Sequence, residues 1–271
     1  MVHTTGYKAF FSNQGNIGCL AKKITYKGKA AHAGGAPWDG INALYAANCG
    51  INAVNAIRET FKENDVIRFH PIITHAGSMV NAIPEEARLE SYVRGKTFDA
   101  IVKENKKVNR ALTGAALSLG ANIEILDIPG YAPLVNNQNM ITLAKDAYET
   151  AFPGEKFIVN THYSSGSTDM GDLSCIMPVV HPYAPGASGT SHGDDFYITD
   201  PELACIKNAK WQLVMLKLLL ENGAERAKQI VSDFKPMFAS KEEYLAYVDA
   251  LASSGDRIVY GDNGTATVNM W

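Results

Sequence analysis

The apolar and polar positions of residues 18–128 follow two alternating periods, one typical of strands and one typical of helices. Residues 19–28 carry apolar side chains in phase with one another and end in a glycine, which predicts a half-exposed strand. Residues 40–62 have apolar side chains at helical spacing, with Asp39 as a candidate N-cap. We therefore expect this segment to begin with a strand and an amphipathic helix.

The second half of the segment repeats this pattern with one more strand. Residues 66–73 are rich in β-branched and aromatic side chains, and residues 87–94 alternate strictly, so both predict strands. Thr97 can cap a helix that ends at Gly120, and residues 123–125 predict a last short strand. The order strand, helix, strand, strand, helix, strand is that of a ferredoxin-like, split βαβ unit whose sheet has one free face.

Residues 129–271 follow a different pattern, in which helices predominate. Strands are predicted at 156–161 and 176–181, and helices at 139–151, 201–220, 224–233 and 240–252. So few short strands cannot form a covered parallel sheet by themselves. We therefore expect a complete small domain, residues 18–128, inserted into a larger α/β domain formed by residues 1–17 and 129–271, whose first half is absent. The alternative is that residues 129–271 form a small α-rich domain that is complete.

The composition is that of an ordinary globular protein and excludes several classes of partner. The 271 residues are 46% hydrophobic and 20% charged, and a formal net charge of −3 gives no electrostatic reason to bind nucleic acid or an anionic membrane. The four cysteines contain no Cys-x-x-Cys pair and are expected to be reduced thiols. No apolar run reaches the roughly 18 residues of a membrane span, and no signal peptide is visible, so we expect a cytoplasmic protein.

Three of the seven histidines lie in settings where binding sites are common. His32 follows the first predicted strand in a run of small residues, His192 lies in a Gly- and Ser-rich segment, and His3 precedes Thr-Thr-Gly. The backbone of such segments can approach a ligand closely. No HExxH motif is present, so each histidine taken alone is interpreted as structural or superficial.

Asn81 and Arg94 form a further candidate pair. Asn81 begins an Asn-Ala-Ile-Pro segment between two predicted strands, where an amide can hold a carbonyl group. Arg94 can bind a carboxylate through two parallel hydrogen bonds. On composition alone, these residues are a turn and a surface arginine.

Taken in order, these segments resemble the zinc amidohydrolases of the aminoacylase and carboxypeptidase type. The nearest branch contains p-aminobenzoyl-glutamate hydrolase and indole-acetyl-amino-acid hydrolase. The resemblance covers about residues 1–222 and is carried by YKGKAAHA (26–33), NAIP (81–84) with Arg94, STDMGD (167–172) and GTSH (189–192). It implies a ferredoxin-like lid, which is also a dimerisation domain, inserted into a zinc-peptidase-like α/β catalytic domain.

The resemblance also implies a role for each candidate residue. His3 and His192 correspond to metal ligands on either side of the lid. His32 corresponds to the lid histidine that reaches the active site of a neighbouring protomer and stabilises the tetrahedral oxyanion. Asn81 and Arg94 correspond to lid residues that hold the carbonyl and the carboxylate of the substrate.

The implied cofactor is zinc, as two ions in the complete family site, with another divalent metal such as manganese as the alternative. The implied partners are an N-acyl amino acid or dipeptide-like substrate and a second copy of the chain, bound through the lid. The family's other metal ligands and its general base lie upstream of the lid and have no counterpart here, and stable zinc sites have three or four protein ligands. We therefore expect a fragment of a metal-dependent amidohydrolase that is inactive by itself. The alternative is a catalytically inactive dimerisation module left by truncation.

Overall fold

The computed structural model describes residues 1–270, which form two compact units. Unit 1 comprises Met1–Ile17 and Ala132–Tyr244, and unit 2 comprises Gly18–Tyr131 and the residues from Leu245 onward. The chain is a mixed α/β protein, as predicted, and each unit has a hydrophobic core of its own. No helix within residues 1–270 combines the length and the apolar character needed to cross a bilayer.

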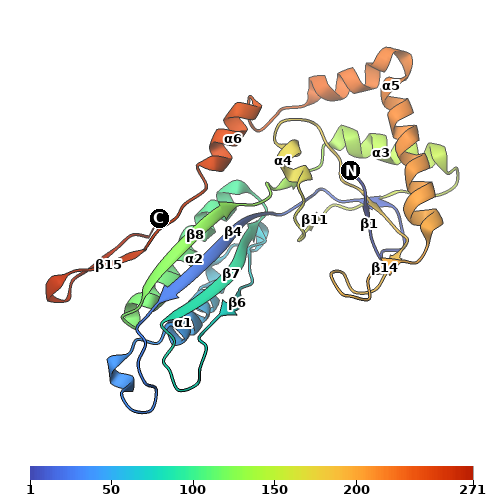
Figure 1. The fold of residues 1–271 in the computed structure, drawn as a ribbon. Helices are drawn as coiled ribbons and strands as arrows, with labels where there is room; N and C mark the ends of the chain where they lie inside the picture. Colours follow the sequence, from blue (N-terminus) through green and yellow to red (C-terminus); the bar gives the residue numbers. More distant parts are fainter. Residues whose placement is uncertain (271) are drawn as a thin grey trace. The chain divides into compact units, whose positions relative to one another are not determined.

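Unit 2 is built on an antiparallel sheet with the strand order β5-β7-β4-β8 (Figure 1). The strands are β4 Gly18–Lys27, β5 Arg68–Phe69, β6 Ile72–His75, β7 Glu86–Gly95 and β8 Asn122–Pro129, with β6 also paired to β7. The long strands β4 and β7 pair from Gly18 opposite Gly95 to Lys27 opposite Glu86. This order of strands confirms the predicted split βαβ unit.

Helices α1 Ala43–Ala56 and α2 Phe98–Ser118 cover one face of this sheet (Figure 1). The Oγ1 of Thr97 accepts a hydrogen bond from the N–H of Ala100 (3.1 Å), which confirms the predicted cap of α2. The predicted cap of α1 is wrong. Asp39 ends a short 3-10 turn, and Asn42 caps the helix instead by accepting from the N–H of Tyr45 (3.0 Å).

The residues from Leu245 onward, which the sequence analysis assigned to the larger α/β domain, lie along β8 in unit 2. Ser253 and Asp127 exchange two backbone hydrogen bonds (2.7 and 3.1 Å), and Ile258 is fully buried in the core of unit 2. A short hairpin follows, β15 Ile258–Tyr260 with β16 Ala266–Val268. This segment covers the outer edge of β8, whereas β6 at the other side of the sheet is exposed along its whole length.

Unit 1 contains short strands and longer helices. A four-stranded sheet has the order β1-β12-β2-β10, and a three-stranded sheet has the order β11-β3-β9. The strands are β1 His3–Thr4, β2 Phe11–Ser12, β3 Gly15–Asn16, β9 Leu134–Val135, β10 Ile158–Val159, β11 Tyr163–Ser164 and β12 Tyr183–Ala184. The strand predicted at 176–181 is wrong, because that segment is extended without ladder partners and the strand begins at Tyr183.

The core of unit 1 forms between α3 Gln138–Ala151 and α5 Asn208–Asp233. Trp211 is fully buried there and donates its Nε1–H to the carbonyl of Ala144 (2.8 Å). α5 is preceded by a π-helical turn, Glu202–Lys207, and has non-helical backbone angles at 221–224. That kink lies between the two helices predicted at 201–220 and 224–233.

Candidate active site

His32 is held in a loop of unit 2 by its own neighbours in the chain. Its Nδ1 accepts hydrogen bonds from the backbone N–H groups of Gly34 (3.1 Å) and Gly35 (2.9 Å). Because Nδ1 is an acceptor, the neutral ring carries its proton on Nε2. The exposed imidazole therefore presents an N–H donor, which is the group that stabilises a developing oxyanion.

The loop that carries His32 pairs with the loop that carries Asn81. The N–H of Ala33 donates to the carbonyl of Asn81 (2.9 Å), and His32 lies opposite Ala82 in an isolated antiparallel bridge. Both His32 and Asn81 are exposed. The structure thus brings together two of the three lid residues that were predicted to contact the substrate.

Arg94 lies at the other end of β7. The loop of Asn81 leads into Glu86, the first residue of that strand, and Arg94 is its next-to-last residue. Eight residues of extended chain separate Glu86 from Arg94 by roughly 26 Å. Arg94 is partly buried, with its guanidinium carbon 5.1 Å from the centre of the Tyr92 ring. Within one copy of unit 2, Arg94 is therefore far from His32 and Asn81.

His3 lies in unit 1 beside two other rings. Strand β1 pairs in parallel with β12, and His3 is opposite Tyr183. His181 precedes Tyr183 by two residues, so both rings project to the same side of an extended segment. The ring centres are 6.1 Å apart for His3 and His181, and 5.2 Å apart for His181 and Tyr183. Two histidines from distant parts of the chain thus meet here.

His181 is buried without a hydrogen-bond partner for its ring. Its side chain is 2% exposed, and neither ring nitrogen has a partner. Burial lowers the pKa of His181 to about 4, an effect to which the amino terminus and His3 add and which Asp169 opposes. The ring is therefore neutral at pH 7, the form in which imidazole binds metal ions.

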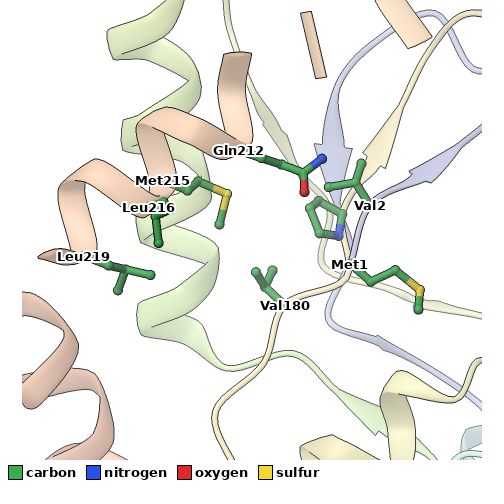
Figure 2. Close-up of a pocket in the computed structure, with 8 residues that line it drawn as sticks. Met1, Val2, Val180, Gln212, Met215, Leu216 and Leu219 are labelled. Carbon is green, nitrogen blue, oxygen red and sulfur yellow. The ribbon is translucent and has the colours of Figure 1, made fainter. Parts of the chain in front are cut away.

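The main chain of His181 is firmly held. Its N–H donates to Oδ1 of Asn136 (2.8 Å), which in turn donates to the carbonyl of Asn13 (2.9 Å). The neighbouring residues Val180 and Pro182 line an apolar cavity of about 210 Å³. Figure 2 shows this cavity, whose other lining residues are Met1, Val2, Gln212, Met215, Leu216 and Leu219. Packing and backbone bonds therefore position this segment without any bond from the imidazole.

His192 lies in an exposed loop between β13 Ala187–Ser188 and β14 Tyr197–Ile198. Its φ of 68° is unusual for a residue other than glycine and stores backbone strain. The loop is closed by the N–H of Thr190, which donates to Oδ1 of Asp195 (3.0 Å). Within residues 1–270, no three His, Cys, Asp or Glu side chains are arranged to hold one metal ion. The structure therefore does not gather the predicted ligands His3 and His192 into a complete metal site.

The sequence analysis assigned no role to His181. The signal was present, because a histidine between Val180 and Pro182 at the end of an apolar run has a polar ring that needs a partner once buried. The position of that ring beside His3, however, depends on the pairing of β1 with β12.

A second cavity of unit 1 lies beside Tyr183. It has a volume of about 520 Å³, within the range of about 300–1,000 Å³ that small-molecule sites occupy. Phe11 stacks on Tyr183 in its wall, with ring centres 4.8 Å apart. The lining also includes Tyr7, Lys8, Asn160, His162 and Tyr163. Aromatic surface with a few polar groups is the usual lining of a ligand site.

Residues 14–118 match the peptidase dimerisation domain family. An Xaa-Arg dipeptidase of Homo sapiens is 30% identical over 178 residues, which are 64% of this chain and 40% of that protein. A p-aminobenzoyl-glutamate hydrolase homolog of Haemophilus influenzae is 36% identical over 102 residues, which are 38% of this chain and 22% of that protein. The chain thus spans less than half the length of these relatives.

Solved structures share the fold of most of the chain. An aminobenzoyl-glutamate utilization protein of Klebsiella pneumoniae has a TM-score of 0.61 at 18% identity and covers 82% of this chain and 55% of its own. A dinuclear metal binding peptidase of the M20 family from Bacillus subtilis has a TM-score of 0.55 at 21% identity, with coverage of 80% and 53%. Together with the family match they confirm the predicted resemblance: residues 14–118 of this chain belong to the M20 peptidase dimerisation domain.

Proposed function

We propose that this chain is part of a metal-dependent amidohydrolase that cleaves the amide bond between an acyl or aminobenzoyl group and an amino acid with a free carboxylate. Unit 2 serves as the lid, and unit 1 as the C-terminal part of the catalytic domain. The observation that carries the proposal is the arrangement of His32, whose Nδ1 is occupied by two backbone donors and whose Nε2–H is free. The human and Haemophilus relatives support the substrate class, since their names denote a dipeptidase and a p-aminobenzoyl-glutamate hydrolase.

The proposed metal is zinc, with manganese as the alternative, and this chain contributes His3 and His192 as ligands. The metal supplies polarisation of the amide carbonyl and a water with a lowered pKa. His32 donates to the oxygen of the carbonyl as negative charge develops there, and Asn81 holds that carbonyl. Arg94 binds the carboxylate. Because stable zinc sites need three or four protein ligands, we expect the 271 residues alone to be inactive.

We further propose a homodimer in which the substrate contacts His32 and Asn81 of one copy and Arg94 of the other. The separation of roughly 26 Å between the two ends of β7 supports this division, because a dipeptide-sized substrate is much shorter. The edge strand β6 supports pairing with a second copy. It is exposed, and it includes the apolar residues Ile72 and Ile73, whereas the edge at β8 is already covered by residues 253–258.

The four free cysteines support the proposed cytoplasmic location.

The proposal is tested by an assay of the natural protein that contains these residues, loaded with zinc, against N-acyl amino acids, Xaa-Arg dipeptides and p-aminobenzoyl-glutamate. We expect hydrolysis that requires the metal and a free substrate carboxylate. A folded, zinc-loaded protein that cleaves none of these amides would refute the proposed function.

Mixing two inactive variants tests the shared site. Neither His32→Gln nor Arg94→Ala is expected to be active alone. Random mixing should restore about a quarter of the wild-type activity, because half of the dimers are mixed and each mixed dimer has one intact site of two. A mixture as inactive as its components would show that His32 and Arg94 of the same copy act together.

A further inference from the structure

We propose that His181 is a metal-binding residue that acts together with His3. The inference rests on the proposed function, which requires a metal. It adds a ligand that the family resemblance does not assign, and it takes that ligand from the unoccupied atoms of the structure.

The first argument concerns the ring nitrogens of His181. Buried polar atoms of folded proteins nearly always have a hydrogen-bond partner, and each atom left without one costs about 1–3 kcal/mol. Both ring nitrogens of His181 lack a partner, although its main-chain N–H is bound to Asn136. A metal ion bound to one of them would supply a partner for a group that the protein leaves without one.

The second argument concerns the distance to His3. Two imidazoles on one tetrahedral zinc ion, with Zn–N bonds of about 2.0–2.1 Å, have ring centres roughly 5 Å apart. The observed distance between the ring centres of His3 and His181 is 6.1 Å. His3 is exposed, so a rotation of its side chain can supply the difference of about 1 Å while packing keeps His181 in place.

The third argument concerns charge and access. Asp169, which precedes α4 Met170–Ser174 and belongs to the STDMGD segment, is close enough to His181 to interact with it electrostatically. A carboxylate beside two neutral imidazoles favours a cation. Because His3 is exposed, an ion can reach this position from solvent.

The competing interpretation is that His181 only fills space between His3 and Tyr183. The two interpretations differ in what His181→Leu does. Leucine has a similar volume and no polar atom, so it removes the unpartnered nitrogens without creating a large void. If the nitrogens have no partner in the metal-free chain, this variant should be at least as resistant to urea as the unchanged chain. A space-filling role predicts no effect on metal binding.

The experiment measures Zn²⁺ affinity of the 271-residue chain by competition with a chromophoric chelator. We compare the unchanged chain with His3→Leu, His181→Leu and the control His70→Leu, which alters an exposed histidine of unit 2. We expect His3→Leu and His181→Leu each to weaken binding at least tenfold, or by about 1.4 kcal/mol, and His70→Leu to change it by less than about twofold. Urea unfolding of the metal-free variants accompanies each titration.

A second measurement avoids substitution altogether. In the unchanged chain labelled with ¹⁵N-histidine, a ring nitrogen of His181 and one of His3 should shift together as Zn²⁺ is added. A His181 ring that does not respond, or an affinity that survives His181→Leu, would overturn the inference. So would a chain that binds no Zn²⁺ in a saturable way. Amide hydrolysis by the natural protein is scored separately, so a failed metal titration does not decide the proposed function.

Discussion

The substitution Asp127→Asn tests the buried polar network of unit 2. Lys22 and Asp127 lie opposite each other on β4 and β8 and form a hydrogen-bonded ion pair whose members are 1% and 2% exposed. Asn105 and Asn109 of α2 donate to Oδ2 of Asp127 (2.8 and 3.2 Å), as does the hydroxyl of Ser253 (3.3 Å). The amide of asparagine has nearly the shape of the carboxylate, so the variant leaves the charge of Lys22 buried without its counter-charge.

We expect a loss of about 3–5 kcal/mol at neutral pH, the usual cost of removing one partner of a buried pair, out of a total stability of roughly 5–15 kcal/mol. The loss should depend on pH. Burial lowers the pKa of Lys22 to about 8 even though Asp127 opposes this shift, so without Asp127 the pKa falls further. In the unfolded chain, a lysine keeps its ordinary pKa of about 10.4. Between the two values the unfolded state binds more protons, so the stability of the variant rises with pH, and its deficit should shrink from pH 6 to about pH 9.

Urea unfolding followed by circular dichroism at both pH values measures the loss, and amide hydrogen exchange in β4 and β8 separates unit 2 from unit 1. The double variant Lys22→Met with Asp127→Leu should recover most of the stability, because it removes both charges. The control Lys27→Met breaks a pair with Asp256 (2.9 Å) whose lysine is 42% exposed, and should cost less than about 1 kcal/mol. A loss below about 1 kcal/mol in Asp127→Asn, or an equal loss at both pH values, would refute the reasoning.

Four further outcomes are expected. His32→Gln should lower kcat of the natural protein by about 10²–10³ with little change in KM, in steady-state assays, because the donor acts as the oxyanion forms; an unchanged kcat would exclude that role. Ile73→Lys should weaken the homodimer in analytical ultracentrifugation, since it places a charge on the exposed edge β6; wild-type dimerisation would exclude that edge. A chain that ends before Ser253 should associate with rising concentration in light scattering, since β8 loses its cover; a monodisperse truncated chain would contradict this. His162→Ala should raise KM but leave Zn²⁺ affinity unchanged if the cavity beside Tyr183 holds part of the substrate; an unchanged KM would argue against that use.

Much of unit 2 could be predicted from the sequence because its signals are local. Strict alternation identified the strand at 87–94, and the cap at Thr97 and the glycine at 120 limited α2. The burial of Lys22 was not predictable, because a lysine in phase with apolar residues reads as half-exposed until Asp127 is known to lie opposite it. The docking of residues 253–258 on β8 likewise depends on pairing between distant segments.

The two histidines that matter most to the proposed chemistry illustrate the same difference within the site. His32 was identified from a short run of small residues, and that run also determines its chemistry, because Gly34 and Gly35 occupy Nδ1 and leave an N–H donor. His181 is available for the opposite reason, since nothing around it occupies either nitrogen. Which ring atom is free depends on hydrogen bonds, and hydrogen bonds follow from sequence only where the partner is a near neighbour. A sequence motif can therefore identify a donor such as His32, whereas a buried acceptor such as His181 is recognised only after the fold has brought His3 beside it.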